Sequence, residues 1–312
     1  MASANLENHP EYGPVLVLAA GNVQARIAPD RGSNLFSLKV GEIELIHVHP
    51  DRPLGPDFTG NFCIYPVPNR VRNSKFTFEG TECSFEGLIP PRGNDVLVHG
   101  LVRALSWNYG KPLTVDAGAI GWTHVHWDES REEFDRFPFT NTLEHRYTIT
   151  PQGVLVDYTT TNLSGKRMPY GYALHPSFKR LSPNDRVRLP AKSVLEMDDE
   201  LLPTGESIKV RGKKGFDLNK AQLLSALDLD HVYTDLTGFP SIEYPEHDLR
   251  VTIESSEDFR FVVIHTRDPK TVEIEPQTCS TDAFNAPNPV AAGLLVLEPG
   301  EQRSGSIMYH IT

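Results

Sequence analysis

Apolar and polar residues alternate along short segments of this chain, with turn residues between the segments. In residues 23–28, VQARIA, the apolar Val23, Ala25 and Ile27 alternate with two polar residues. A period of two is expected of a strand that places one face on a core and the other in water. Similar runs in the first fifty residues predict further strands at VLVLAA (15–20), LFSLKV (35–40) and IELIHV (43–48).

The same pattern continues towards the carboxyl end. Two pairs of runs separated by turn residues predict hairpins, KFTFEG-TECSF (75–85) and HRYTIT-PQG-VLVDYTT (145–160). Four more runs predict strands at LRVTIES (249–255), FRFVVIHT (259–266), TVEIE (271–275) and GSIMYHIT (305–312). Evidence for helix is thin. The best case is DLNKAQLLSAL (217–227), where Asp217 can cap a helix whose apolar residues recur at helical spacing.

The chain has 312 residues, enough for two domains, although all-β folds often exceed the usual domain size without dividing. Its 25 Pro and 23 Gly are scattered between the predicted strands, and no Gly/Ser-rich linker, internal repeat or low-complexity tract interrupts it. We therefore expect residues 1–312 to form a single all-β domain of large antiparallel sheets packed face to face.

Charge and cysteine content restrict the partners and the compartment. A net charge of −11 argues against a general nucleic-acid or anionic-membrane partner, which would require a basic face, and is compatible with a neutral small molecule. No basic region precedes the first apolar run, which is too short to span a bilayer. Cys63, Cys83 and Cys279 indicate neither a disulfide framework nor a zinc site. We expect a soluble, cytoplasmic protein in a reducing compartment.

One acidic residue is a candidate catalytic base. Glu275 lies in VEIEPQTCSTDAF (272–284), where we expect Pro276 to end a strand and a polar loop to follow. A strand fixes the backbone before the carboxylate, and the loop can close around a small molecule. An isolated Glu-Pro pair more often ends an ordinary surface strand, so the interpretation depends on the other polar segments of the chain.

Four such segments precede Glu275. They are YPVPNRVRNSKFTFEG with Arg70, LVHGLVRALSW with His99, YGYALHPSF with His175, and LDLDHVYTDL with Asp230. In this order, and followed by EIEPQT, DAFN and LEPGE, they resemble the aldose 1-epimerase (galactose mutarotase) family. The resemblance runs from about Pro66 to Gly300. It implies a β-supersandwich fold, no metal or organic cofactor, and interconversion of the α and β anomers of a free aldose.

The resemblance also implies the roles of the five residues. Glu275 matches the general base that acts on the C1 hydroxyl, and His175 matches the general acid that protonates the ring oxygen. His99 matches a second histidine that supports charge in the transition state. Arg70 and Asp230 match residues that bind sugar hydroxyls. We expect Glu275 and His175 to lie on opposite sides of the sugar ring, as carboxylate and imidazolium near neutral pH.

Two segments depart from the family pattern. Many members have GRxANR around the arginine, whereas this chain has YPVPNR with Pro66 at the place of the first Arg. ALHPSF replaces the Asn-His-x-Tyr-Phe form of galactose mutarotases proper. The chain therefore resembles a divergent branch, and the resemblance fixes neither the sugar nor whether the protein is a monomer or a homodimer.

Other residues have weaker claims. Trp107, Trp122, Phe178 and Phe284 could stack on a sugar face, although strand aromatics are more often core, and we keep Trp107 and Phe284 as candidates. His124 and His126, with Glu129 and Gly118 nearby, could form part of a cupin-like metal site, because side chains two residues apart on a strand share a face. An exposed polar strand is the preferred interpretation.

Two alternative functions remain open on the same fold. A hexose-6-phosphate 1-epimerase would add cations for the phosphate, and Arg72, Arg92 and Arg103 lie near the candidate site in sequence. A carbohydrate-binding protein without turnover would use the same pocket, although binding alone needs neither a base at Glu275 nor an acid at His175. The first alternative predicts a preference for glucose 6-phosphate over glucose, and the second predicts no catalysis.

Overall fold

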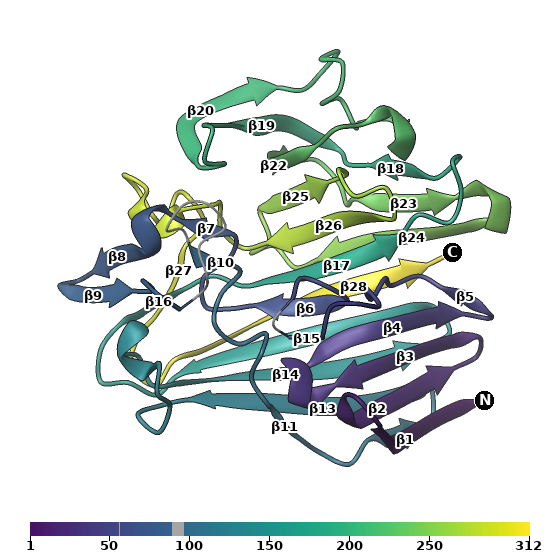
Figure 1. Cartoon of the computed structure of the whole chain (residues 1–312), viewed down its shortest axis with the longest axis horizontal. Helices are drawn as coiled ribbons and strands as arrows, with labels where there is room; N and C mark the ends of the chain where they lie inside the picture. The colour runs from purple at the N-terminus through teal and green to yellow at the C-terminus, as the bar shows by residue number, and fades with distance from the viewer. Residues whose placement is uncertain (56, 89–96) are drawn as a thin grey trace.

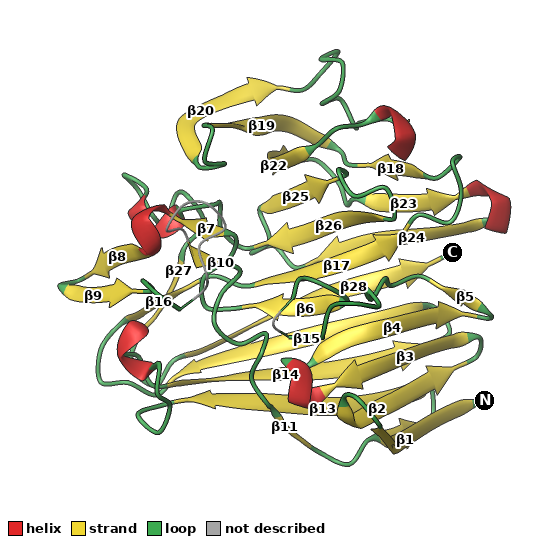
Figure 2. Ribbon diagram, in the orientation of Figure 1, coloured by secondary structure: helices red, strands yellow, loops and turns green. Residues whose placement is uncertain are grey.

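The computed structural model describes residues 1–55, 57–88 and 97–312, with residues 97 and 98 described by their backbone alone. The described chain consists of antiparallel strands joined by turns and single-turn 3-10 helices (Figures 1 and 2). The predicted all-β class is confirmed. Within the described residues, no helix is both long and apolar enough to cross a membrane.

The N-terminal part forms a five-stranded sheet in the order β1 to β5. Its strands are β1 (Ala2–His9), β2 (Gly13–Ala20), β3 (Val23–Ala28), β4 (Asn34–Val40) and β5 (Ile43–Glu44). The alternation at 23–28 has the expected result, since Val23, Ala25 and Ile27 are buried. The predicted strand at 43–48 is confirmed only for its first two residues.

A ten-stranded sheet forms one large layer of the molecule. Its strands are β11 (Asn108–Tyr109), β12 (Leu113–Val115), β13 (Gly118–Trp127), β14 (Asn141–Thr150), β15 (Gly153–Asn162), β18 (Arg186–Arg188), β21 (Gln222–Leu223), β23 (Ser241–Tyr244), β24 (Leu249–Ser255) and β28 (Gln302–Ile311). The strand order is β11–β13–β14–β15–β28–β24–β23–β18–β21, with β12 also paired to β13. The predicted 145–160 hairpin corresponds to β14 and β15.

A seven-stranded sheet forms the second large layer. It contains β6 (Asn61–Ile64), β17 (Ala173–Lys179), β19 (Ala191–Met197), β20 (Pro203–Lys209), β22 (Asp230–Leu236), β25 (Phe261–His265) and β26 (Thr271–Gln277). Their order is β20–β19–β22–β25–β26–β17–β6, so β17 lies between a strand from the first quarter of the chain and one from the last. This arrangement brings distant segments of the sequence to adjacent positions.

Short elements cover one end of the large sheets, on the left of Figure 1. The two-stranded pairs are β7 (Arg70–Val71) with β10 (Leu97–Val98), β8 (Lys75–Phe78) with β9 (Thr81–Ser84), and β16 (Met168–Tyr170) with β27 (Leu295–Leu297). The β8–β9 pair is the predicted 75–85 hairpin.

The described 3-10 turns are distributed along the chain. They are Pro29–Arg31, Arg72–Ser74, Phe134–Arg136, Leu224–Ala226, Pro245–His247 and Ala283–Asn285.

Aromatic side chains join the two large sheets across the core. Phe178 of β17 packs edge-on against Tyr309 of β28, with ring centroids 6.0 Å apart. Asn61 of β6 donates a hydrogen bond to the Tyr309 hydroxyl at 2.9 Å. Tyr158 of β15 stacks on Tyr172, just before β17, at 3.8 Å. These contacts hold β17 rigidly against the layer behind it, which fixes any side chain that β17 directs to the opposite face.

The predicted helix at 217–227 is wrong. Gln222 and Leu223 pair with β18 as an edge strand, and only Leu224–Ala226 forms a single 3-10 turn. The Asp217 carboxylate accepts from the Gly212 and Asn219 amides in a local turn. Pairing with the sheet buries Leu224 fully and satisfies the backbone, and this outweighs a weak helical pattern.

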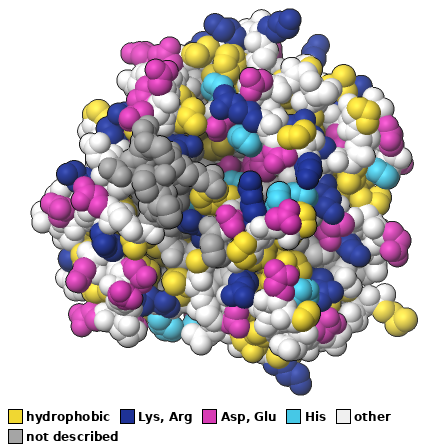
Figure 3. Space-filling model, in the orientation of Figure 1, with side chains coloured by type: hydrophobic (Ala, Val, Ile, Leu, Met, Phe, Trp, Pro, Cys, Tyr) yellow, Lys and Arg dark blue, Asp and Glu magenta, His cyan; other side chains and the backbone are white. Residues whose placement is uncertain are grey.

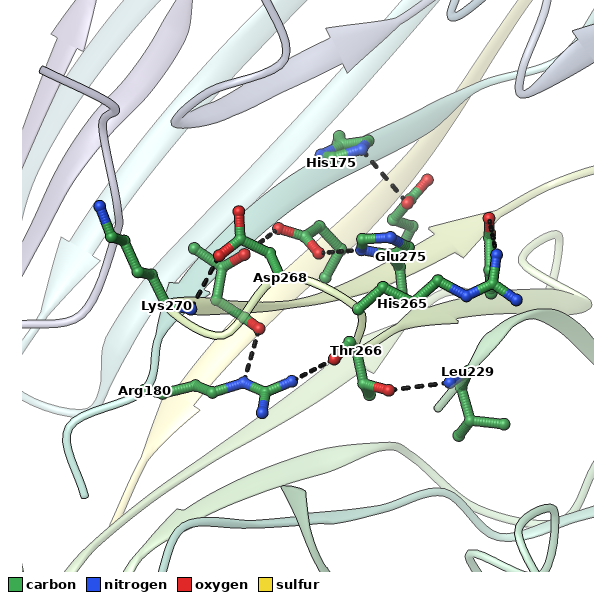
Figure 4. Close-up of polar contacts among 12 residues, drawn as sticks. His175, Arg180, Leu229, His265, Thr266, Asp268, Lys270 and Glu275 are labelled. Carbon is green, nitrogen blue, oxygen red and sulfur yellow. Dashed lines mark hydrogen bonds and ion pairs between the residues drawn. The ribbon is translucent and has the colours of Figure 1, made fainter. Parts of the chain in front are cut away.

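Arg180 stabilises the turn between β25 and β26 by hydrogen bonds to its carbonyl oxygens. It follows β17 directly and donates to the carbonyl oxygens of Thr271 (2.8 Å), Thr266 (2.5 Å) and Leu224 (3.5 Å). Figure 4 shows its guanidinium beside Thr266. Since β25 and β26 are joined by residues 266–270, these bonds fix the relative position of two strands of the seven-stranded sheet.

Replacing Arg180 with Ala should reduce the free energy of unfolding by about 2–4 kcal/mol, because part-buried carbonyl groups lose a charged donor. Arg188→Ala is the matched control, since that arginine is exposed and makes one long bond to the Asn219 carbonyl at 3.3 Å. It should cost less than about 0.5 kcal/mol. Urea unfolding followed by tryptophan fluorescence measures both, and equal losses would contradict the clamping role of Arg180.

Candidate active site

Two rows of side chains cross the seven-stranded sheet on the face away from the core. The cross-strand register places Asp230 of β22 opposite His265 of β25, and His265 opposite Glu273 of β26. In the next row, Glu275 lies opposite Val263, and the β17–β26 register places it opposite His175, which in turn pairs with Phe62 of β6. Cross-strand neighbours have Cβ atoms about 5 Å apart, so the rows form one polar cluster.

The cluster lines a cavity of about 220 Å³. Its described walls are Arg52, Phe58, Asn69, Arg70, His99, His175, Asp230, Val263, His265, Asp268, Glu273 and Glu275. Figure 3 shows histidine, acidic and basic side chains gathered near the middle of this face. All five residues that the sequence analysis selected therefore lie around one cavity, although they come from four strands and one loop.

His175 and Glu275 are in direct contact. The Nε2 atom of His175 lies 3.3 Å from Oε1 of Glu275, and the two side chains point toward each other in Figure 4. They are 7% and 2% exposed. The expectation that they lie on opposite sides of a sugar ring is wrong, because adjacent strands place them side by side. Neighbouring groups can still serve two oxygens that are both bonded to C1.

Burial controls the protonation of this pair. It lowers the pKa of His175 to about 4 and raises the pKa of Glu275 well above its usual range, with the charges of Glu273 and Asp230 adding to the latter effect. A neutral imidazole and a protonated carboxyl are thus favoured over the expected imidazolium and carboxylate. Both forms contain one shared proton, and they differ only in whether Nε2 or the carboxyl oxygen holds it.

The sequence-based expectation that the strand ends at Pro276 is wrong. β26 continues to Gln277, with Pro276 paired to Val262 of β25. On the other side, the pairing with β17 is interrupted between Ala173–Gln277 and Ser177–Glu273, where both Pro176 and Pro276 lack an N–H. The side-chain amide of Gln277 donates to Oε2 of Glu275 at 3.1 Å, so the continuing strand helps to orient the carboxyl group.

Phe58 and Val263 line the cavity on its apolar side, and Phe62 lies buried behind His175. Phe62 stacks on the His175 ring at 4.5 Å, and Phe58 packs edge-on against His99 at 4.8 Å. Within the described chain, Nδ1 of His175 has no hydrogen-bond partner, so the Phe62 stack and the Glu275 contact orient the ring.

Trp107 and Phe284, the two aromatic residues kept as stacking candidates, are buried away from the cavity. Trp107 packs against His145 at 4.8 Å, and Phe284 packs against Phe76 at 4.3 Å. The sequence-based assignment of these two side chains to a sugar platform is therefore wrong, since both belong to the core.

A turn after β10 positions His99, and the short strand β7 positions Arg70. His99 has a left-handed backbone (φ 63°), its amide donates to the Asn69 carbonyl at 2.8 Å, and its ring lies edge-on to His175 at 5.0 Å. Arg103 donates to the His99 carbonyl at 3.2 Å from beneath Phe58. The positive charge of Arg70 acts to lower the pKa of Glu275. Arg70 thus opposes part of the effect of burial.

Asp230 lines the same cavity from β22. Its carboxylate is 3.5 Å from the Arg267 guanidinium, and its side chain is 26% exposed. Asp230 begins β22, so its backbone is fixed by pairing with His265. Asp230 lines the cavity with a partly exposed carboxylate, which suits a residue that accepts hydrogen bonds from hydroxyl groups.

Several residues that line the cavity escaped the sequence analysis, and two of them, Glu273 and His265, form a direct acid–base contact. Glu273 is 6% exposed and accepts from Nδ1 of His265 and from the Thr271 hydroxyl, each at 2.7 Å. The segment TVEIE contained a signal for Glu273, because residues two apart on a strand share a face and Glu273 must then accompany Glu275. His265 follows Val263 in the same way. Taken one at a time, the motifs did not distinguish Glu273 or His265 from ordinary exposed residues.

The candidate phosphate-binding cations do not gather in the described part of the cavity. Arg72 interacts with Asp198 (3.1 Å), Asp282 (3.7 Å) and Glu200 (3.8 Å). Arg103 is buried under Phe58 and donates to backbone carbonyls. Arg92 lies outside the described residues.

The alternative metal motif is placed on β13, in the other large sheet. The rings of His124 and His126 are 5.2 Å apart, and the His126 side chain is exposed. Across residues 1–55, 57–88 and 97–312, no three His, Cys, Asp or Glu side chains gather in a way that could hold a metal ion. The pair therefore lies apart from the cavity that contains Glu275.

Comparison with known proteins extends over nearly the whole chain. A family model described as aldose 1-epimerase matches residues 14–310. A galactose mutarotase-like protein from Clostridium acetobutylicum is 23% identical, with a TM-score of 0.90 over 100% of this chain and 98% of that chain. An aldose epimerase homologue from C. elegans is 17% identical, with a TM-score of 0.78 over 99% of each chain.

A galactose 1-epimerase from Lactobacillus acidophilus is 14% identical, with a TM-score of 0.79 over 100% of this chain and 99% of that chain. At these identities the structural matches establish the shared fold, and the predicted galactose mutarotase-like fold is confirmed. The match of residues 14–310 to the family model also confirms the resemblance on which the sequence analysis relied.

Proposed function

The chain belongs to the aldose 1-epimerase family, and from this premise we propose that it interconverts the α and β anomers of a free aldose. The observation that carries the proposal is the contact between His175 and Glu275 at 3.3 Å in the wall of a small cavity. Mutarotation requires one base and one acid acting on oxygens bonded to the same carbon. A buried pair that shares one proton supplies both groups.

In the proposed reaction, Glu275 removes the proton from the C1 hydroxyl while His175 protonates the ring oxygen. The bond between C1 and the ring oxygen breaks, and a C1 carbonyl forms. Rotation about C1–C2 presents the other carbonyl face, and the reverse transfers close the ring. This direction requires the shared proton on His175, a form that the Arg70 charge favours by lowering the pKa of Glu275. The pair returns to its initial state after each turnover.

Four other cavity residues, Arg70, Asp230, His99 and Phe58, contact the sugar. Arg70 offers planar donors to hydroxyl oxygens, and the Asp230 carboxylate accepts from other hydroxyl groups. His99 lies beside His175 and stabilises charge on the reacting oxygens. The apolar side of the ring packs against Phe58. A volume of about 220 Å³ suits a single small molecule.

We expect free hexoses to be better substrates than glucose 6-phosphate. Apart from Glu275, which shares one proton with His175, the described cavity wall contains three carboxylates, Asp230, Asp268 and Glu273, against two guanidinium groups, Arg52 and Arg70. A phosphate dianion would therefore meet net repulsion. Polarimetry of freshly dissolved α-glucose and α-galactose, corrected for the spontaneous rate, measures the reaction with free sugars. A coupled assay measures it with glucose 6-phosphate.

The outcomes separate the candidate functions. Acceleration with a free hexose, and a lower kcat/KM with glucose 6-phosphate, supports the proposal. A kcat/KM at least tenfold higher for glucose 6-phosphate would favour a hexose-6-phosphate 1-epimerase. Sugar binding measured by calorimetry, with no acceleration for any of the three sugars, would favour a carbohydrate-binding protein.

A further inference from the structure

A second acid–base pair lies next to the first on the same face of the sheet. Glu273 and Glu275 are two residues apart on β26, so both carboxyl groups project into the cavity. His265 lies opposite Glu273 in the register and contacts it at 2.7 Å through Nδ1. The mechanism proposed above uses neither Glu273 nor His265, although burial of a second carboxylate beside the first is costly.

We propose that Glu273 and His265 form a positioning pair that sets the pH range in which His175 and Glu275 hold one shared proton. The inference rests on the proposed mutarotation, since it concerns the proton that the reaction moves. Glu273 is diagonal to His175 across the β17–β26 register, and diagonal neighbours are about 7–8 Å apart. At that distance the Glu273 charge acts on the His175–Glu275 pair through its electric field.

The hydrogen bonds around Glu273 keep its charge in place. Burial acts to raise the pKa of Glu273, but the hydrogen bond from His265, the charge of His175 and the Thr271 hydroxyl together lower it. Burial acts to lower the pKa of His265, yet the hydrogen bond and charge of Glu273 raise it. Glu273 is therefore ionised through the neutral range, whereas His265 is protonated in the acidic part of it.

Charged groups from every packed element face this pair. On the β17 side they are His175 and Arg180, and on the β22 side Asp230. The turn after β25 adds Arg267 and Asp268. Arg70 and Arg103 approach the first pair from the loops around β7 and β10. The Glu273 charge acts on both His175 and Glu275, since it raises the pKa of each.

These charges predict opposite shifts in the two variants. Glu273→Gln removes a negative charge and so lowers both pKa values of the His175–Glu275 pair. The loss of the shared proton and the uptake of a second proton should therefore each occur at lower pH. Both limbs of a bell-shaped profile of kcat/KM should move down by about one pH unit. His265→Gln keeps an amide donor but removes a positive charge. It should move the acidic limb up, because the His265 charge no longer opposes protonation of the His175–Glu275 pair.

The experiment compares pH profiles of the native protein, Glu273→Gln, Glu273→Asp and His265→Gln by polarimetry. Glu273→Asp keeps the charge and should keep the limbs within about 0.3 pH unit of the native profile, even where kcat falls. A matched control is Glu254→Gln, since Glu254 contacts Nδ1 of His310 at 3.3 Å in a half-exposed pair on the other large sheet. It should shift neither limb.

An NMR titration of His175 in ¹⁵N-histidine-labelled protein supplies a readout that needs no activity. The midpoint of His175 protonation should fall in Glu273→Gln and rise in His265→Gln. If neither the midpoint nor the limbs move, the inference is overturned and Glu273 has a structural role only. If the native protein is inactive while the midpoints shift as stated, the coupling holds and the proposed mutarotation fails. Should Glu273→Gln not fold, the Glu273→Asp and His265→Gln comparison still decides the matter.

Discussion

Replacing Glu275 with Gln should lower kcat for mutarotation by about 10³-fold or more, to a rate near that of the spontaneous reaction. Gln has the same shape but cannot take the proton of the C1 hydroxyl. Glu275 is 2% exposed and lies 3.3 Å from Nε2 of His175, so the substitution removes the base from the cavity wall while keeping a side chain of the same size beside His175. Polarimetry with saturating hexose measures kcat directly.

The same substitution should raise the free energy of unfolding at neutral pH. Burial raises the pKa of Glu275 in the folded state, so above its ordinary pKa the unfolded chain releases a proton that the folded chain retains. Stability then falls as pH rises, and removing the group removes that loss. Glu129→Gln is the control, since Glu129 is exposed, and it should change neither rate nor stability. Loss of activity with loss of stability would point to a structural role for Glu275.

Arg70→Ala provides the contrast that separates chemistry from binding. It should lower kcat/KM by about 10–100-fold, mainly through a higher KM, because it removes charged hydrogen bonds to the sugar. Glu275→Gln should instead leave KM nearly unchanged. Equal, small effects of the two substitutions would contradict the roles assigned to both residues.

Period-two alternation accounts for most of the successful fold predictions. Where one face of a strand is buried, as in residues 23–28, the pattern specifies both the strand and its orientation. It fails at 217–227, where the apolar residues also fit a helix and only the partner strand β18 decides between the two. Local sequence contains no information about that partner, which lies some thirty residues earlier in the chain.

The site was predictable in composition but not in arrangement. Motif resemblance selected Glu275 and His175, yet their contact depends on the register of β17 and β26, whose residues are about one hundred positions apart. The protonation of the pair depends on burial, which no motif expresses. Phe62 illustrates the same limit: it stacks on His175 only because β6 is the edge strand beside β17.

His175→Gln should lower kcat by about 10²–10⁴-fold, because the ring oxygen then leaves without a proton donor. The variant keeps a hydrogen-bonding side chain beside Glu275 but loses the stack on Phe62, which lies 4.5 Å from the native ring. His126→Gln is the control, since His126 is exposed on the other large sheet. Polarimetry should find native activity in His126→Gln, and a thermal unfolding scan reports whether His175→Gln remains folded.

Combining His175→Gln with Glu275→Gln should reduce kcat little further than the more damaging single substitution. The two groups share one proton across 3.3 Å, so removing either leaves the other unable to complete the transfer. Independent groups would instead give a loss equal to the product of the two single losses. Such a product would mean that the contact between His175 and Glu275 is incidental, and that acid and base act through separate proton routes.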